Sequence, residues 1–306
     1  MSLEVDAILD RRRLRRNVSL WRIVAIIAVV SALALFAASQ TGSQLAIGNY
    51  VAELEVTGII IDDEERDQAI RDLVKNDNAK ALMVTIESPG GTTSGSEGLY
   101  LALREVAQHK PVVAVMGAVA ASGGYITAIG ADHIIARGNT ITGSIGVLFQ
   151  NTEFSKLLKT IGVDVELVTS GPLKAKPSPF EPLDEQGRAA LNALIKDSYG
   201  WFLDLVIERR NLTPERARIL SDGRVYTGRM ALEAKLIDQI GGKAEAREWL
   251  ETQKSISADL PLETLEYGDR GPFMDRVTGS MVSSLMGKSL NLKRLTLDGL
   301  VSVWQP

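Results

Sequence analysis

Hydrophobic and polar positions alternate along the chain in two different periods from residue 49 onward. Short apolar runs rich in β-branched residues stand between segments whose apolar residues recur at a spacing of three and four. The first kind of run predicts strands, at 50–60, 79–88, 110–117, 133–136 and 164–170. The second kind predicts helices, at 62–76, 96–108, 153–162, 184–210 and 213–221, with a further helix that ends near Leu250. This alternation predicts an α/β domain.

The first forty residues follow another pattern, in which a basic leader precedes the uncharged run IVAIIAVVSALALFAA. Such a run of sixteen residues forms a helix of roughly 24 Å, and its flanking residues bring it near the length of a bilayer core. No charged residue follows until Glu53, so the positive-inside rule places the rest of the chain outside the cytoplasm. We expect a cytoplasmic leader at 1–22 and a membrane anchor at 23–39. A cleavable signal peptide is the alternative, because small residues end the run.

Composition narrows the classes of function. The chain has 306 residues, of which 45% are hydrophobic, and its net charge is −4. Because no basic stripe appears beyond the leader, nucleic acid is not expected as a partner. The chain contains no cysteine, which excludes thiol nucleophiles, disulfides and thiolate metal sites together.

The segment AVAASGGYITAIG, at 118–130, sets Ser122 directly after a predicted strand and at the start of a helix. A serine there can cap the helix by accepting a hydrogen bond from a free amide, a contribution of roughly 1 kcal/mol. The same position also suits a nucleophile, because the amide of Gly123 then points to where the oxyanion of acyl transfer develops. The segment alone leaves both interpretations open.

A second segment, ESPGGTTSG at 87–95, follows another predicted strand. In open α/β sheets, ligands bind at the carboxyl ends of the strands, and the paired Gly90 and Gly91 present unobstructed amides there. A tight turn is the alternative interpretation of Pro-Gly-Gly. The pattern of a phosphate-binding loop is absent, because no Gly-Lys-Ser/Thr follows.

A serine nucleophile needs a base, and neither His109 nor His133 is expected to face Ser122. A lysine whose pKa is depressed by burial is the alternative base. VTSGPLKAKPSPF offers Lys174 and Lys176, although most lysines in such loops are solvated. TGSIG, at 142–146, offers Ser144 as a hydroxyl partner for the amine, and an ordinary turn is its alternative interpretation.

Five segments together resemble the signal peptide peptidase A family of membrane-bound serine proteases, peptidase family S49. They are SPGG at 88–91, ASGGY at 121–125, TGSIGV at 142–147, TSGPLKAKPSPFEPL at 169–183 and DGRVYTGRMALEAKLID at 222–238. The resemblance implies a fold similar to those of Clp protease and crotonase, built from repeated strand-strand-helix units. It also implies catalysis by a serine and a lysine.

The resemblance implies a role for each matching residue. Ser122 matches the nucleophile, Lys174 the general base, and Ser144 the serine that holds the lysine amine. The amides of Gly91 and Gly123 match the oxyanion donors, and Gly90 is the alternative to Gly91. One departure is Ala175, which follows the base where many members have aspartate or serine.

From these observations we expect a protease domain at 49–252 and an extension at 253–306. The extension contains a helix candidate at 272–287, PFMDRVTGSMVSSLMG. It is either a mobile or packing segment or a helix that binds a membrane or partner. The expected activity is endoproteolysis of cleaved signal peptides and other hydrophobic peptides, without metal or organic cofactor. The expected location is the bacterial inner membrane, with the catalytic domain on the periplasmic side. The chain contains one catalytic unit, which in the family implies a ring-shaped homo-oligomer. A crotonase-like acyl-CoA enzyme and a silent membrane scaffold are the competing classes.

Overall fold

The computed structural model describes residues 21–29, 48–267 and 301–303. The chain divides into two compact units, Met1–Gly48 and Asn49–Pro306. In the first unit, residues 21–29 form a helix with exposed side chains. No helix among the described residues is long and apolar enough to cross a membrane. Most of the predicted anchor at 23–39 lies outside the described residues.

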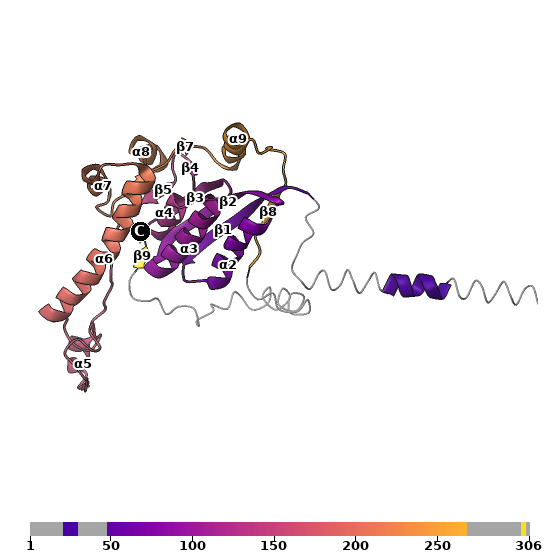
Figure 1. Ribbon diagram of the computed structural model, residues 1–306. Coiled ribbons are helices and arrows are strands. Elements are labelled where there is room, and N and C mark those ends of the chain that lie inside the picture. The colour runs from indigo at the N-terminus through magenta and orange to yellow at the C-terminus, as the bar shows by residue number, and fades with distance from the viewer. Residues whose placement is uncertain (1–20, 30–47, 268–300, 304–306) are drawn as a thin grey trace, which may run out of the picture. The chain divides into compact units, whose positions relative to one another are not determined.

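The second unit contains strands and helices in alternation (Figure 1). Its strands are β1 (Tyr50–Ile60), β2 (Ala79–Thr92), β3 (Val112–Ala121), β4 (His133–Ala136), β5 (Ile141–Gly143), β6 (Val225–Thr227), β7 (Gln239–Ile240), β8 (Leu262–Thr264) and β9 (Val301–Val303). Its helices are α2 (Glu64–Asp72), the 3-10 helix η1 (Leu73–Lys75), α3 (Thr93–Ala107), α4 (Gly123–Ile129), α5 (Ser155–Thr160), α6 (Glu185–Arg210), α7 (Pro214–Leu220), α8 (Gly228–Glu233) and α9 (Lys243–Lys254). The predicted α/β domain is confirmed.

The described strands form one nine-stranded sheet, in which β6, β5, β3, β2, β1 and β8 lie in this order. The central strands β1, β2 and β3 are parallel. β4 and β5 both pair with β3 in the parallel sense, whereas β6 joins β5 and β9 joins β2 in the antiparallel sense. Because the three central strands run the same way, their carboxyl ends meet at one edge of the sheet.

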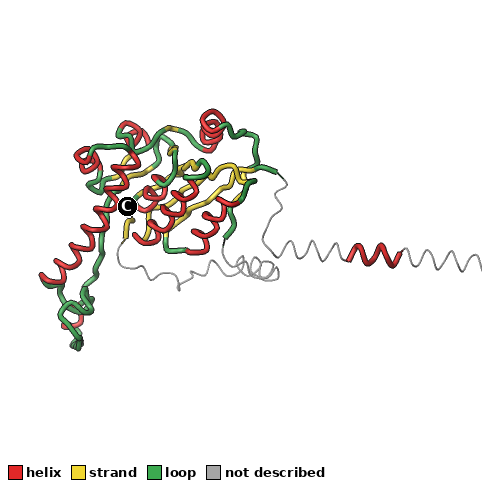
Figure 2. The backbone as a smooth tube through the Cα atoms, in the orientation of Figure 1, coloured by secondary structure: helices red, strands yellow, loops and turns green. Residues whose placement is uncertain are grey.

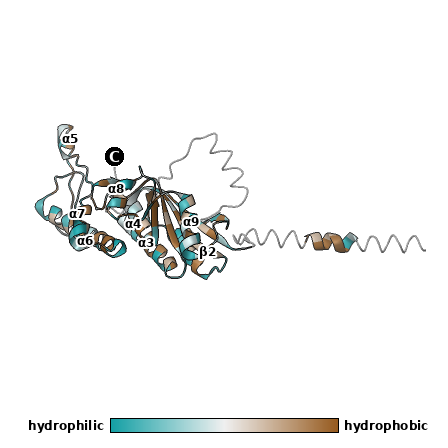
Figure 3. Cartoon of the chain, turned by 90° about the horizontal axis from the view of Figure 1, so that it is seen from above, coloured by the Kyte–Doolittle hydropathy of each residue, from teal (hydrophilic) through white to brown (hydrophobic). Residues whose placement is uncertain are grey.

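Side chains of the central strands alternate between two hydrophobic layers, as the period of a strand requires. On one face, residues such as Leu82 and Val84 pack with α2, α3, α4 and α6. On the other face, Ala81 and Met83 pack with Ala246 and Leu250 of α9. Figure 3 shows the resulting concentration of hydrophobic residues on the strands, between the helices. Both faces are covered, which explains the nearly continuous apolar sequence of β2 and β3.

Short polar side chains fix where several helices begin, which is the expected role of residues at a helix N-cap. The side chains of Asp63, Thr92 and Asp184 accept hydrogen bonds from amides of the first turn of α2, α3 and α6. α7 begins after Thr213 with Pro214 in its first turn, where the missing amide of proline costs nothing. The cap at Thr92 places the start of α3 directly after β2.

The structure corrects two predicted strand ends, because β3 continues to Ala121 rather than ending at residue 117, and β2 also continues further than predicted. Pro-Gly-Gly was expected to form a turn after residue 88, but β2 continues to Thr92. Gly91 pairs with Ile60 of β1, and a Cβ on Gly91 would collide with the carbonyl of Ile60. Glycine at this position therefore permits the close approach of two strands rather than a turn.

A further correction concerns residues 164–170, which were predicted to form a strand but have no regular secondary structure. Their apolar residues alternate as in a strand, yet no other strand of the described chain lies beside them. They belong to a projection, here called the α5 arm (residues 150–184), which extends from the sheet together with the first half of α6 (Figure 2). The helix candidate at 272–287 lies outside the described residues.

Candidate active site

The carboxyl ends of β2 and β3 bring the SPGG and ASGGY segments together. Ser88 pairs with Ala120 in the parallel register of these two strands. Two residues further along each strand come Gly90 and Ser122. Segments about thirty residues apart in the sequence therefore share one edge of the sheet, because the two strands are parallel neighbours.

Ser122 lies at a sharp turn between β3 and α4, with φ of 56° and ψ of −116°. This conformation is uncommon for a residue with a side chain, and it persists only where the surroundings impose it. The amide of Ser122 donates to the carbonyl of Gly143 at 2.8 Å, and its carbonyl accepts from the amides of Tyr125 and Ile126, each at 2.9 Å. The Ser122 side chain makes no capping hydrogen bond. Ser122 thus occupies the N-cap position of α4, but its hydroxyl does not cap the helix, which was the alternative interpretation.

Gly123 comes into close contact with the loop at Gly90 and Gly91. A Cβ on Gly123 would collide with the hydroxyl of Ser96 and would lie 3.0 Å from the nitrogen of Gly91. The same point is 3.2 Å from the Cα of Gly90. Only a glycine fits in this gap, so the backbones of the two expected oxyanion segments lie side by side.

The hydroxyl of Ser88 distinguishes between the two candidate amides at Gly90 and Gly91. It accepts a hydrogen bond from the amide of Gly90 at 3.1 Å and donates to the carbonyl of Gly58 at 2.6 Å. The Gly90 amide is thus already engaged, whereas the Gly91 nitrogen lies in the gap beside Gly123. The sequence placed Ser88 in the SPGG motif but did not indicate that its hydroxyl holds the loop by bonding to Gly58 and Gly90.

Ser144 lies close to Ser122 through its neighbour Gly143, whose carbonyl accepts the Ser122 amide. Ser144 has a positive φ of 49°, and its own amide donates to the carbonyl of Arg224 at 2.9 Å. A cavity of about 370 Å³ adjoins it. The lining residues are Ser144, Ile145, Gly146, Val147, Leu148, Ile195, Lys196, Tyr199, Ser221, Asp222 and Gly223.

The two candidate lysines have different environments on the α5 arm. Lys176 forms ion pairs with Glu181 at 2.8 Å and Asp184 at 3.1 Å. Its hydrogen bonds to these carboxylates raise the pKa of Lys176, so it remains charged at neutral pH. Lys174 lies exposed in a turn, where its ammonium makes no hydrogen bond or ion pair with a described residue. Within the single chain, no hydrogen bond joins Lys174 to Ser122.

Both histidines have partners elsewhere. The Nδ1 atom of His109 lies 3.1 Å from the carbonyl of Glu105. His133 pairs with Val113 near the start of β3, whereas Ser122 follows the end of that strand. The ring of His133 stacks on Trp249, with the ring centroids 4.8 Å apart. Neither histidine is placed to serve Ser122 as a base.

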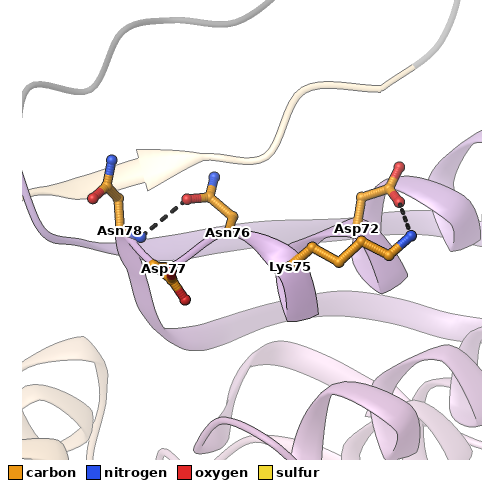
Figure 4. Close-up of a pocket in the computed structure, with 5 residues that line it drawn as sticks. All are labelled: Asp72, Lys75, Asn76, Asp77 and Asn78. Atoms are coloured by element: carbon orange, nitrogen blue, oxygen red, sulfur yellow. Dashed lines mark hydrogen bonds and ion pairs between the residues drawn. The ribbon is translucent and has the colours of Figure 1, made fainter.

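Another hollow, of about 440 Å³, lies at the turn between η1 and β2 (Figure 4). Its lining is polar, with Lys75 beside Asp72 and the amide of Asn78 donating to the side chain of Asn76 at 3.1 Å. It lies at the amino end of β2, the opposite end from Gly91. It therefore does not belong to the site around Ser122.

The turn that carries Ser122 has the form of a nucleophile elbow, in which a strained strand-to-helix turn presents a serine and the next amide serves the oxyanion. A turn of this form fits a serine-type protease. Residues 104–257 match the model of peptidase family S49, and the chain belongs to this family.

Several relatives have protease names. A protein named as a protease in Synechocystis sp. is 39% identical over 233 residues, which cover 75% of this chain and 83% of that protein. A protein of Enterococcus faecium named as a signal peptide peptidase is 29% identical over 87% of this chain and 80% of its own length. A chloroplastic serine protease of Arabidopsis thaliana is 30% identical over 81% of this chain and 36% of its own length.

Proposed function

We propose that the chain is a membrane-anchored endopeptidase that cleaves released signal peptides and other hydrophobic segments through Ser122 and Lys174. The observation that carries this proposal is the strained turn at Ser122, beside which the backbones of Gly91 and Gly123 meet. Strain of this kind is typical of functional sites, because the rest of the fold must compensate for it. The proposed fold family is that of Clp protease and crotonase, which the parallel central strands and their covering helices fit.

The mechanism proceeds in two acyl-transfer steps. Neutral Lys174 removes the proton of the Ser122 hydroxyl as Oγ attacks the peptide carbonyl. The amides of Gly91 and Gly123 stabilise the negative oxygen of the tetrahedral intermediate. The lysine then gives its proton to the leaving amine, and the carbon–nitrogen bond breaks. Water, deprotonated by the same lysine, hydrolyses the ester at Ser122 and restores both groups.

A second copy of the chain would bury Lys174, which is exposed in the single chain. A lysine becomes a base when burial depresses its pKa, whereas Lys174 is exposed on the α5 arm. The arm also exposes many apolar side chains, which is typical of a surface that another protein covers. They are Phe154, Leu157, Ile161, Val163, Val165, Leu167, Val168, Leu173 and Phe180. We therefore infer that the arm packs on a neighbour in a homo-oligomeric ring.

Charges on the apolar surface of the arm are expected to dissociate this oligomer. The variant I161D/V168D places two carboxylates on side chains that are 63% and 92% exposed in the single chain. Burial of unpaired charges at an interface is costly, so the variant should become monomeric and lose peptidase activity. Light scattering coupled to size-exclusion chromatography measures the change. The matched control is L101D, an exposed leucine on α3 outside the arm, which should keep the parent's mass. An unchanged mass of I161D/V168D would contradict the proposed interface.

Substrate is expected to lie extended along the edge of β2 at Gly90 and Gly91. β1 and β9 flank this part of β2, and β9 pairs with it in the antiparallel sense. A substrate strand would take the place of β9 and form the same kind of backbone hydrogen bonds. Such pairing gives affinity that does not depend on sequence, and side-chain pockets then select residues. The cavity beside Ser144, with walls from Ile145, Val147 and Leu148, suits an apolar side chain. These features support hydrophobic peptides as the substrate class.

The proposal is tested by trapping the acyl-enzyme equivalent. A peptide phosphonate with an apolar side chain next to phosphorus should label the full chain in detergent or vesicles, and mass spectrometry of the digest should place the adduct on Ser122. Labelling should fall when a hydrophobic peptide competes. An adduct on another serine, or no adduct together with no hydrolysis of apolar peptides, would contradict the proposed function.

A further inference from the structure

Ser96 is a buried residue beside the oxyanion segments to which neither the motifs nor the family resemblance assigned a role. It belongs to the first turn and a half of α3, and it is 0% exposed. A Cβ on Gly123 would project into the space that the Oγ atom of Ser96 occupies. The nitrogen of Gly91 borders the same space. The hydroxyl is thus directed at the gap between the two expected oxyanion donors.

The hydroxyl of Ser96 has no hydrogen-bond partner among the described residues. Only one other buried side-chain nitrogen or oxygen of the described chain shares this property, the hydroxyl of Ser221. Ser221 belongs to the lining of the cavity beside Ser144. Buried hydroxyls are nearly always paired, because a desolvated polar group without a partner is unfavourable. Both exceptions therefore lie at the candidate active site, where a partner can arrive with the substrate.

We propose that Ser96 is a further catalytic residue of the peptidase reaction: its hydroxyl donates a third hydrogen bond to the oxyanion held between the amides of Gly91 and Gly123. The inference rests on the proposed function and adds a residue to it. No bond to Ser96 forms or breaks. The hydroxyl rotates toward the negative oxygen as the tetrahedral intermediate forms, and the hydrogen bond is lost when the carbonyl returns.

Burial does not separate Ser96 from the reacting atoms. Ser122 is itself only 1% exposed, and Gly91 and Gly123 are also buried. The nucleophile and the hydroxyl of Ser96 are therefore buried to a similar degree. A donor in such a dry setting stabilises developing charge more strongly than it would in water, and it needs no reorganisation at the moment of reaction.

The test compares S96A with the parent in three measurements: steady-state hydrolysis of an apolar peptide, inhibition by a peptide aldehyde that forms a hemiacetal oxyanion, and thermal unfolding. We expect kcat to fall about 100-fold with KM little changed, as for the loss of one oxyanion donor. The affinity for the aldehyde should fall by a similar factor. The melting temperature should stay the same or rise, because alanine removes an unpaired buried hydroxyl. The matched control is S94A, an exposed serine of the same helix, which should behave as the parent.

The outcomes separate this inference from the proposed function. If the parent hydrolyses peptides and S96A matches it in kcat and in aldehyde affinity, Ser96 is not a donor to the oxyanion. A fall in melting temperature with unchanged kinetics would overturn the inference as well, since it would indicate a structural partner for the hydroxyl. If the parent itself hydrolyses no apolar peptide and takes up no phosphonate, the proposed function fails first.

Discussion

Replacement of Ser122 by alanine is expected to abolish peptide hydrolysis, with a loss in kcat on the order of 10⁶-fold, as when the nucleophile of a serine protease is removed. The backbone hydrogen bonds of residue 122 to Gly143, Tyr125 and Ile126 do not involve its side chain, so the fold should persist. Circular dichroism and the melting temperature check the fold, and hydrolysis of an apolar fluorogenic peptide measures the activity.

Ser155 offers a matched control for this variant, because it is another buried serine, 7% exposed, but lies at the start of α5. S155A should keep measurable hydrolysis, whereas S122A should not and should also fail to take up the phosphonate. Hydrolysis by S122A at more than a thousandth of the parent's rate would refute Ser122 as the nucleophile.

Replacement of Lys174 by methionine should lower kcat by about 10⁴-fold, the upper range for the loss of a general base. Methionine keeps most of the length and apolar character of the side chain while it removes the amine. The neighbouring lysine provides the comparison: K176M loses the ion pairs with Glu181 and Asp184 and should retain activity within a few-fold. The raised pKa of Lys176 keeps its amine protonated, so it cannot take the serine proton.

The dependence of kcat/KM on pH gives a second readout for the base. A lysine base works only without its proton, so the kcat/KM of the parent should increase as the pH is raised. The residual activity of K174M should lack this rise. If K176M is the inactive variant and K174M keeps the rise, the base is Lys176 and the proposed pairing with Ser122 is wrong.

The sequence predicted the class of fold well because the apolar period of each element reflects which faces are buried. The hydrophobic periods predicted the bounds of four elements closely, namely β1, β4, α6 and α7. The N-cap residues Asp184 and Thr213 mark the beginnings of α6 and α7. The same reasoning failed at residues 89–92 and 164–170. Glycines in a strand resemble a turn in sequence, and an alternating segment forms a strand only when another strand lies beside it.

The residues of the candidate site were predictable from the sequence, but the contacts between them were not. The order of the motifs indicated Ser122, Gly91 and Gly123, and the parallel register of β2 and β3 places these residues together. Nothing in the sequence indicated that the hydroxyl of Ser88 engages Gly90 or that the hydroxyl of Ser96 points at Gly123 without a partner. Such relations depend on distances between elements, which a pattern along the chain does not contain.

By itself, the sequence determined an α/β domain and membership of a family of serine proteases. It also favoured a lysine as the base, because neither histidine was expected to face Ser122, and this remains a prediction. Only the tertiary structure decided that the Gly90 amide is engaged by Ser88, that the backbone at Ser122 is strained, and that Lys174 is exposed in the single chain. The physical reason is that local periods report burial, whereas catalysis depends on the contacts of residues that are far apart in sequence and adjacent in space.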